Sequence, residues 1–544
     1  MSNFYPNLDI EPFSSETIRH ALSNKYTSES FINSKQNYKN ILKGLQPKAQ
    51  TLLIERIHVS RDFLDSYAGY IVESFEFYPK YCNRIHFFSK GFDEDDLHRE
   101  LSKPDSSFIK EIVGSYLGFI VVRPIPNSVI GLTILDPRIY IQEENAVLFG
   151  VRKYYTHLFG QKIELITLAY QEQDKGTSAC ATASIWYLLN QIAILPRYYL
   201  KSPILITHSA GDIGYNGDQL FPNKGLNQTQ MNTALKKSNL GFHMFNMKDT
   251  KDTSSESLTL NAFSKGILYS YSFINIPILL VIKIKTNKLK GHHSIAVIGY
   301  KKPNSCKRKP TGRLFLVSEL VTTFYAHDDQ LGPFREIELI DGTREINHPF
   351  VKTNKEGGKV DPEEYVKIER IIAATYPKIR IKYSDILKIL TGLDNIFMSY
   401  FEMICTKDRE EAMSWDVRLL FSTDYKAKIS SDVDMMDEHR EKILSSIFPK
   451  YIWVATLLFG ESQRIFDFIF DATDLQNSCF MMSIAEYQHK VSYFHDDIRK
   501  VLRNKKNLSH FEKFFSNMDR KIWMERLLTL LKPINALCGT NSLS

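Results

Sequence analysis

A cysteine stands between a polar loop and an apolar helical segment near the middle of the chain. Residues 171–180 read QEQDKGTSAC and residues 181–195 read ATASIWYLLNQIAIL, which predicts that Cys180 begins a helix. A helix N-terminus carries partial positive charge and favours a thiolate over a thiol. Because a thiolate is a strong nucleophile, this placement suits covalent catalysis, whereas an unreactive buried thiol is the commoner role of a free cysteine.

A histidine and two aspartates further along the chain could complete such a site. His293 begins the segment HSIAVIGYKK, which predicts a strand, and a regular strand would turn its neighbour His292 to the opposite face. Asp328 and Asp329 follow the next predicted strand. A carboxylate bonded to the far ring nitrogen would orient the histidine and stabilise its charged form. Without such neighbours, these residues would be ordinary strand-end and turn residues.

The segments around these residues predict the elements that must position them. A strand over Gln161–Tyr170 precedes the cysteine loop, and a short amphipathic helix is predicted over Gly225–Gly241. Three further strands are predicted in INIPILLVIKIK, HHSIAVIGYKK and RLFLVSELVTTFYAHDD. This mixture of helices and strands indicates an α+β fold.

The order of these segments resembles the papain-like cysteine peptidase superfamily, most nearly its bacteriocin-processing branch and relatives. QEQDKGTSACATASIWYLL is similar to the family's entry from a glutamine loop into the cysteine helix. INIPILLVIK and HHSIAVIGY resemble the family's two strands that lead to and carry the histidine, and AHDDQLGPF resembles its aspartate turn. The resemblance covers roughly residues 165–345.

The resemblance implies a papain-like catalytic domain, in which the cysteine helix packs on an antiparallel sheet that bears the histidine. It implies a triad of Cys180, His293 and Asp328, with Gln173 as the oxyanion residue. The alternative oxyanion residue is Gln171, and Asp329 is the alternative to Asp328.

The activity implied by this resemblance is that of a cysteine hydrolase. It would cleave a peptide or isopeptide bond of a protein substrate through a thioester intermediate. Two alternatives stay open at this stage: a transglutaminase- or deamidase-like acyl transfer from the same site, and a papain-like fold that acts only as a binding module or scaffold.

The length of 544 residues suggests about three domains. We predict an N-terminal helical lead with a small sheet (1–160), the catalytic domain (161–345) and a mixed α/β domain (346–544). In the N-terminal region, we predict that most of residues 1–75 are helical, including residues 49–75. Strands are then predicted at Tyr81–Ser89, Gly114–Val122, Val129–Leu135 and Ala146–Val151. The C-terminal prediction is helices at Glu364–Ala374, Tyr383–Leu393 and Tyr487–Leu531, and strands at Trp415–Phe421, Tyr451–Leu458 and Ile465–Phe470.

The composition excludes several classes of protein. Hydrophobic residues make up 43% and charged residues 24%, which is ordinary globular usage and excludes a disordered or fibrous chain. The net charge of +7 is small for this length, so we expect no nucleic-acid partner. Neither a signal peptide nor a membrane-spanning run is recognisable, and six scattered cysteines fit a reducing compartment. We therefore expect a cytoplasmic protein without a membrane partner.

No metal or cofactor is predicted. The four residues His292, His293, Asp328 and Asp329 could supply metal ligands, but CxxC, HExxH and Gly-rich phosphate motifs are missing. The basic loop Lys301–Arg313 could attract an acidic substrate or simply be a solvated hairpin loop. The flanking regions could bind the substrate, a partner protein or another copy of the chain.

Overall fold

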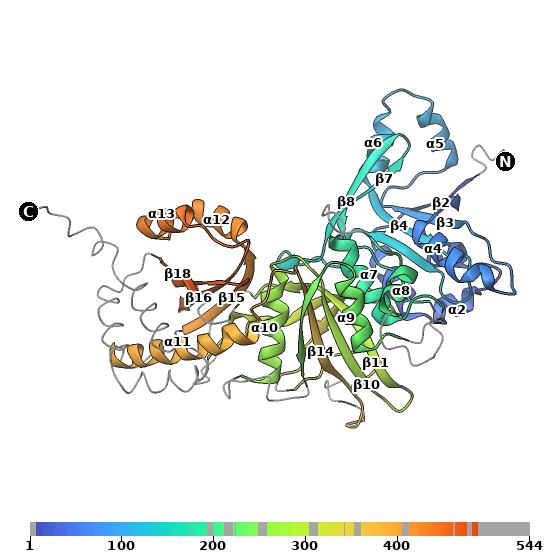
Figure 1. Ribbon diagram of the computed structural model, residues 1–544. Coiled ribbons are helices and arrows are strands. Elements are labelled where there is room, and N and C mark those ends of the chain that lie inside the picture. The colour runs from blue at the N-terminus through green and yellow to red at the C-terminus, as the bar shows by residue number, and fades with distance from the viewer. Residues whose placement is uncertain are drawn as a thin grey trace, which may run out of the picture.

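In the computed structural model, the described residues form three large antiparallel sheets and one two-stranded sheet. The three large sheets follow one another along the molecule in chain order, with helices packed against each (Figure 1). The fold is therefore α+β, as predicted. The structure describes residues 7–174, 176–192, 200–211, 221–222, 225–247, 258–303, 314–341, 343–352, 359, 361–404, 413–460, 463–475 and 481–487. In these ranges, every helix is too short or too polar to cross a membrane.

The N-terminal unit is a five-stranded sheet with six helices around it. Its strands, in sheet order, are β1 (Leu8–Pro12), β2 (Thr51–His58), β3 (Cys82–Phe88), β4 (Tyr116–Val122) and β5 (Ile130–Leu135). Its helices are α1 (Ser15–Leu22), α2 (Glu29–Ser34), α3 (Gln36–Leu45), α4 (Arg61–Gly69), α5 (Glu94–Leu101) and α6 (Ser107–Gly114), and the short turn η1 (Ile71–Glu73) follows α4.

The predicted helix over residues 49–75 is wrong in its first part. Residues Thr51–His58 form β2, which pairs with β1 on one side and β3 on the other. The helix-like spacing of apolar residues is outweighed because both neighbouring strands satisfy the backbone of β2 and its first four side chains are buried. A helix does follow, as α4.

The central unit is a seven-stranded sheet. Six strands run in the order β13 (Gly332–Glu338), β12 (Thr323–Asp328), β11 (Lys290–Lys301), β10 (Ile278–Lys285), β14 (Tyr365–Thr375) and β9 (Gly241–Asn246), and β6 (Ala146–Leu148) also pairs with β11. The hairpin β7 (Arg152–Leu158) and β8 (Gln161–Thr167) precedes the cysteine loop.

The predicted helix at Glu364–Ala374 is wrong, because this segment is strand β14. It lies between β10 and β9 and is paired on both sides. The run YVKIERIIAAT is rich in β-branched residues and nearly all buried, as expected of a strand inside a sheet. The sheet that carries His293 therefore continues past the predicted domain boundary at residue 345.

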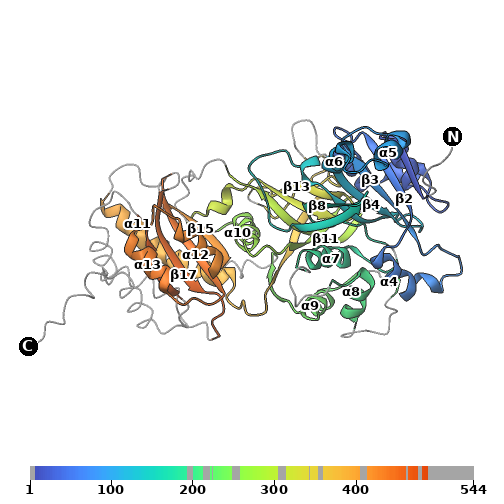
Figure 2. The ribbon, with the colours of Figure 1, turned by 90° about the horizontal axis from the view of Figure 1, so that it is seen from above.

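Four helices of the described residues belong to the central unit. They are α7 (Cys180–Ile192), α8 (Pro203–Gly211), α9 (Gln228–Lys236) and α10 (Leu260–Ser272). Helix α7 packs mainly on β11, and α8 and α9 pack beside it. Helix α10 contacts both the central sheet and β15 of the next unit, and Figure 2 shows it between the two.

The C-terminal unit is a four-stranded sheet with three helices. Its strands are β15 (Met413–Phe421), β16 (Tyr451–Phe459), β17 (Gln463–Asp471) and β18 (Met481–Glu486), and its helices are α11 (Tyr383–Ile404), α12 (Ser422–Ser430) and α13 (Asp437–Ser445). The three strands predicted here and the helix from Tyr383 are present. The predicted helix beyond Tyr487 and most of the basic loop Lys301–Arg313 lie outside the described residues.

One continuous apolar core links the three sheets. It includes Ile18 of α1, Trp186 of α7 and Trp453 of β16, all of which are fully buried. A smaller second cluster lies under α12 and α13. The units are therefore joined by buried surface as well as by the chain.

A hydrogen bond joins the N-terminal unit to the cysteine helix. Trp186 Nε1 donates to the Asp62 carboxylate at 2.8 Å. Burial raises the pKa of Asp62 to about 6, against this hydrogen bond and the charge of Arg61, and the neighbouring Asp65 raises the pKa further. The folded protein thus binds the Asp62 proton more tightly than the unfolded chain, whose aspartates titrate near 3.9.

We predict that Asp62→Asn stabilises the protein in a pH-dependent way. The raised pKa means that the wild-type protein loses stability as the pH rises from about 4 to about 6, and a neutral amide that still accepts from Trp186 avoids this loss. At pH 4 the free energy of unfolding of the variant should equal that of the wild-type protein. At pH 7.5 it should exceed the wild-type value by up to about 3 kcal/mol. Urea unfolding at both pH values measures this, and a variant that is less stable at pH 7.5 would contradict it.

Candidate active site

Cys180 is the first residue of α7, as the sequence predicts. The residues from Ala181 to Ile192 are all buried, whereas Cys180 itself is partly exposed. One turn into the helix, the Ser184 hydroxyl donates to the backbone carbonyl of Ser294 at 2.9 Å. Because Ser294 follows His293 directly, this bond fixes the start of the helix against the strand that carries the histidine.

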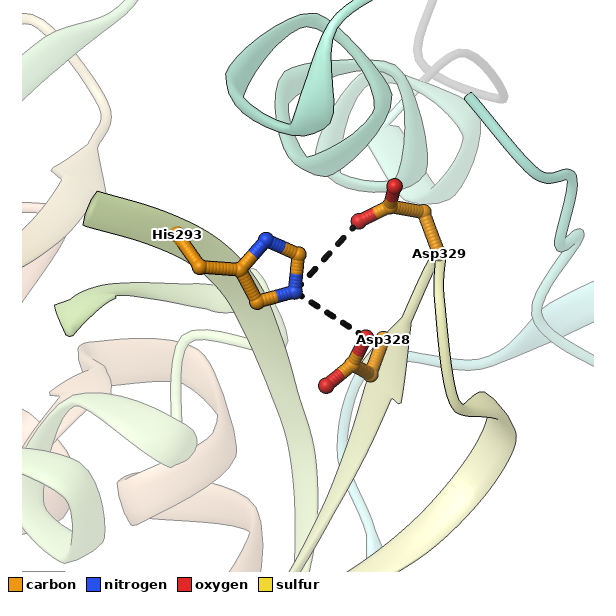
Figure 3. A group of neighbouring side chains, drawn as sticks. All are labelled: His293, Asp328 and Asp329. Atoms are coloured by element: carbon orange, nitrogen blue, oxygen red, sulfur yellow. Dashed lines mark hydrogen bonds and ion pairs between the residues drawn. The ribbon is translucent and has the colours of Figure 1, made fainter. Parts of the chain in front are cut away.

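His293 lies between the cysteine helix and the end of β12. Ala296 pairs with His327 in the antiparallel register, which brings the last residues of β12 close to His293. His293 Nε2 lies 3.0 Å from Asp328 Oδ1 and 3.6 Å from Asp329 Oδ1. Figure 3 shows that the other ring nitrogen, Nδ1, points away from both carboxylates. Nδ1 has no hydrogen-bond partner among the described residues, so it is the nitrogen left for the Cys180 thiol, which lines the same pocket.

Asp328 is buried, and donors surround it. The backbone N–H groups of Gln330 and Leu331 donate to Oδ1 at 3.0 and 3.1 Å. Arg335 donates to Oδ2 at 3.4 Å, and His348 Nε2 lies 3.7 Å from the same oxygen. Burial opposes the ionised form, but His293, His348 and Arg335 together hold the pKa of Asp328 well below its ordinary value.

Asp329 has the opposite environment. It is buried, and neither carboxylate oxygen has a hydrogen-bond partner among the described residues. Burial raises the pKa of Asp329 to about 7, and although His293 opposes this, the negative charge of Asp328 adds to it. The two neighbouring carboxyl groups thus differ in ionisation near neutral pH, with Asp328 the charged partner of His293.

The environment of His293 favours the imidazolium. Burial alone would lower the pKa of His293, but the neighbouring Asp328 and Asp329, the hydrogen bond to Asp328 and the nearby Cys180 thiol together raise it well above its ordinary value. A positively charged imidazole beside a thiol is the arrangement that thiol nucleophiles require.

A pocket of about 580 Å³ opens at Cys180 and His293. Its wall includes Gln173, while Gln171 is buried in the loop and lines a separate internal cavity of about 10 Å³. The Gln171 carbonyl accepts a hydrogen bond from the Tyr187 hydroxyl at 2.6 Å, which fixes it inside the protein. Of the two predicted oxyanion residues, Gln173 is thus the one that shares the pocket of Cys180.

His292 also lines this pocket, but it is exposed where His293 is buried, as the alternation along a regular strand predicts. Its side chain is 57% exposed, and Nε2 lies 2.8 Å from the buried carboxylate of Glu369. Glu369 lies at a register shift between β10 and β14, where β14 has one residue more than its partner. The ion pair between His292 and Glu369 depends on β14, which the sequence analysis predicts as a helix. No sequence signal therefore pointed to this ion pair.

The loop ahead of Cys180 is anchored by charged groups that the sequence analysis missed. Glu172 is 3% exposed and forms a salt bridge with Lys35 of the N-terminal unit. It also accepts from Asn37 Nδ2 at 2.9 Å and from the Ile130 N–H at 2.7 Å. Arg123 donates to the Glu172 carbonyl at 3.2 Å. The loop that carries Gln173 is therefore held by the N-terminal unit.

A metal ion is the other chemistry that this cluster could serve. His293, Asp328 and Asp329 each offer a ligand atom, and these atoms lie within 4.8 Å of one another. However, the Arg335 guanidinium and two backbone N–H groups already face Asp328, and a cation would compete with them. The donors therefore favour a hydrogen-bonded histidine–aspartate pair.

Comparison of the sequence with protein-family models finds no match, and comparison with curated proteins finds none either. The functional argument therefore depends on the site itself.

We predict that Glu172→Gln destabilises the protein, because it leaves the Lys35 ammonium partly buried without its counter-charge. The free energy of unfolding should fall by about 3 kcal/mol, the range found when one partner of a buried ion pair is removed. Urea unfolding measures this, with Glu144→Gln at an exposed position as the matched control. Equal stability of the two variants would show that the salt bridge contributes nothing.

Proposed function

We propose that the protein is a thiol hydrolase that cleaves a peptide or isopeptide bond of a protein substrate. The observation that carries this proposal is the position of His293, with one nitrogen on Asp328 and the other available to Cys180 at the N-terminus of a buried helix. The order of the helix, the histidine strand and the aspartate turn also supports a papain-like catalytic domain, in which α7 packs on an antiparallel sheet.

The proposed reaction has two stages. His293 accepts the proton of the Cys180 thiol, and the thiolate attacks the acyl carbonyl. The Gln173 amide and the Cys180 backbone N–H donate to the oxyanion, and one such donor is typically worth about 3–4 kcal/mol. His293 then protonates the leaving amine, the C–N bond breaks and a thioester remains. A water molecule that gives its proton to His293 attacks the thioester and releases a carboxylic acid and the thiol.

The buried Asp328 has a positioning role in this scheme. Its hydrogen bond to Nε2 leaves Nδ1 facing the thiol and stabilises the imidazolium formed in the first step. Because its pKa is about 7, Asp329 is only partly ionised near neutral pH, which reduces repulsion between the adjacent carboxyl groups.

The first test is the pH dependence of alkylation by iodoacetamide, followed at each cysteine by mass spectrometry. A thiol with an ordinary pKa of about 8.5 is only ~1% ionised at pH 6.5. We predict that at this pH Cys180 reacts at least about tenfold faster than the other cysteines and that His293→Ala removes this advantage.

Cys82 is the internal control for this experiment. It is 1% exposed, and burial raises its pKa to about 12, so it should stay unreactive in the folded protein. If Cys180 is as unreactive as Cys82, or if its rate is the same in His293→Ala, the hydrolase proposal is refuted in favour of a non-catalytic binding protein.

A second prediction separates the two aspartates. Asp328→Asn removes the charge that faces Nε2 and should slow the alkylation of Cys180 at pH 6.5 by about tenfold, because the imidazolium loses its partner. Asp329→Asn replaces a carboxyl group whose pKa of about 7 leaves it mostly neutral at pH 6.5, so it should change the rate less than threefold. The same mass spectrometric assay measures both, and a reversed order would make Asp329 the orienting carboxylate.

A further inference from the structure

A second cavity is lined by part of the loop that carries Gln173, at Asp174, Gly176 and Thr177. It has a volume of about 360 Å³, within the range of ligand-binding clefts. Its apolar wall comes from Tyr70, Ile71 and Tyr78 on the segment after α4 and from Ile125 before the turn into β5. Asp174 is part of its rim. We call it the N-terminal cavity.

The N-terminal cavity and the catalytic pocket share part of the loop as a common wall. Asp174 lines both, directly after Gln173. The Asp174 carboxylate accepts from the backbone N–H groups of Gly176 and Ser178 at 2.9 and 3.1 Å, which folds the loop into the shared wall. A bound polypeptide that crosses the loop at Asp174 would have side chains on both sides of this wall.

The walls of this cavity are held in place by other contacts. The Tyr78 ring packs on Tyr26 with a centroid distance of 4.8 Å, and the Tyr26 hydroxyl donates to the Phe77 carbonyl at 2.6 Å. The backbone N–H of Asn127, which also lines the cavity, donates to the Thr27 hydroxyl at 2.8 Å. A cavity whose walls are fixed by other residues costs little to organise on binding.

Exposed apolar side chains adjoin the cavity in sequence. Phe75 is fully exposed and Phe77 is 75% exposed, both between cavity-lining Ser74 and Tyr78. Large aromatic side chains that stay in water beside a preformed apolar cavity are typical of a surface that binds protein.

We infer that the N-terminal cavity is a substrate subsite, which binds an apolar or aromatic side chain of the polypeptide whose acyl group is attacked by Cys180. This inference rests on the proposed function. It assigns specificity to the N-terminal unit: the apolar wall selects the side chain, and the shared loop sets its position relative to the thiol.

The test uses the full chain and a set of N-acetyl tetrapeptidyl chloromethyl ketones, in which Phe or Asp occupies one of four positions and Ala the others. The Cys180 thiolate displaces chloride, so a C–S bond forms as the C–Cl bond breaks, and mass spectrometry gives the labelling rate. At one of the four positions, the inhibitor with Phe should label Cys180 at least about tenfold faster than the inhibitor with Asp. Ser128→Trp, which fills the cavity from its rim, should reduce this ratio to about one.

Two controls make the result specific. Ser430→Trp adds the same side chain to an exposed position of the C-terminal unit and should leave the ratio unchanged. Tyr78→Ala removes part of the apolar wall and should lower the ratio even if Ser128→Trp does not fold. Labelling of Cys180 by iodoacetamide, which is too small to reach the cavity, should be unaffected by all three variants.

The outcomes separate the two proposals. If iodoacetamide selects Cys180 but the Phe-to-Asp ratio is unchanged in Ser128→Trp and Tyr78→Ala, the subsite is refuted and the hydrolase proposal stands. If iodoacetamide does not select Cys180 in the wild-type protein, both are refuted.

Discussion

A histidine and two carboxyl groups are buried side by side, and the rest of the site depends on how their charges are compensated. Removing ionised groups from water is costly unless each finds a partner. Asp328 has His293, Arg335 and two backbone N–H groups, so it stays ionised. Asp329 has no such donors and is driven toward its neutral form. The division of charge between two adjacent residues thus follows from which one receives hydrogen bonds.

The same principle explains how the N-terminal unit takes part in the site. The loop between β8 and α7 carries a buried Glu172 that needs partners. Lys35 and Asn37 at the start of α3 and Arg123 after β4 supply them, from two separate segments. Asn37 also reaches the Asp329 carbonyl at 3.4 Å, so one small region touches both the loop and the aspartate turn. The loop conformation that presents Gln173 therefore depends on the N-terminal unit as much as on the central sheet.

Local patterns were enough to predict the elements whose signals lie within their own sequence. The helix at Cys180, the strand of His293 and the turn at Asp328 each carry such a signal, and they are present. Strand β14 was predicted as a helix, because its strand conformation is determined by β10 and β9, which lie far away in sequence.

The electrostatic partners could not be predicted for a related reason. Glu172, Arg335 and Glu369 are unremarkable charged residues in sequence, and each gains its role from a partner that only the fold brings near. The ionisation of Asp329 depends in the same way on which backbone groups the turn offers to its neighbour.

The position of β14 inside the central sheet has a consequence for how the protein is made. Within the described residues, β9 pairs only with β14, although β10, β11 and β12 all leave the ribosome between the two. The nascent chain therefore holds the cysteine, the histidine and the aspartates before it holds the strand that completes the sheet beneath them. Pairings between distant segments form slowly. During synthesis, β9 and one edge of β10 therefore stay without their partner strand until β14 has been made. The reactive groups emerge first, and the strand that completes their sheet emerges last.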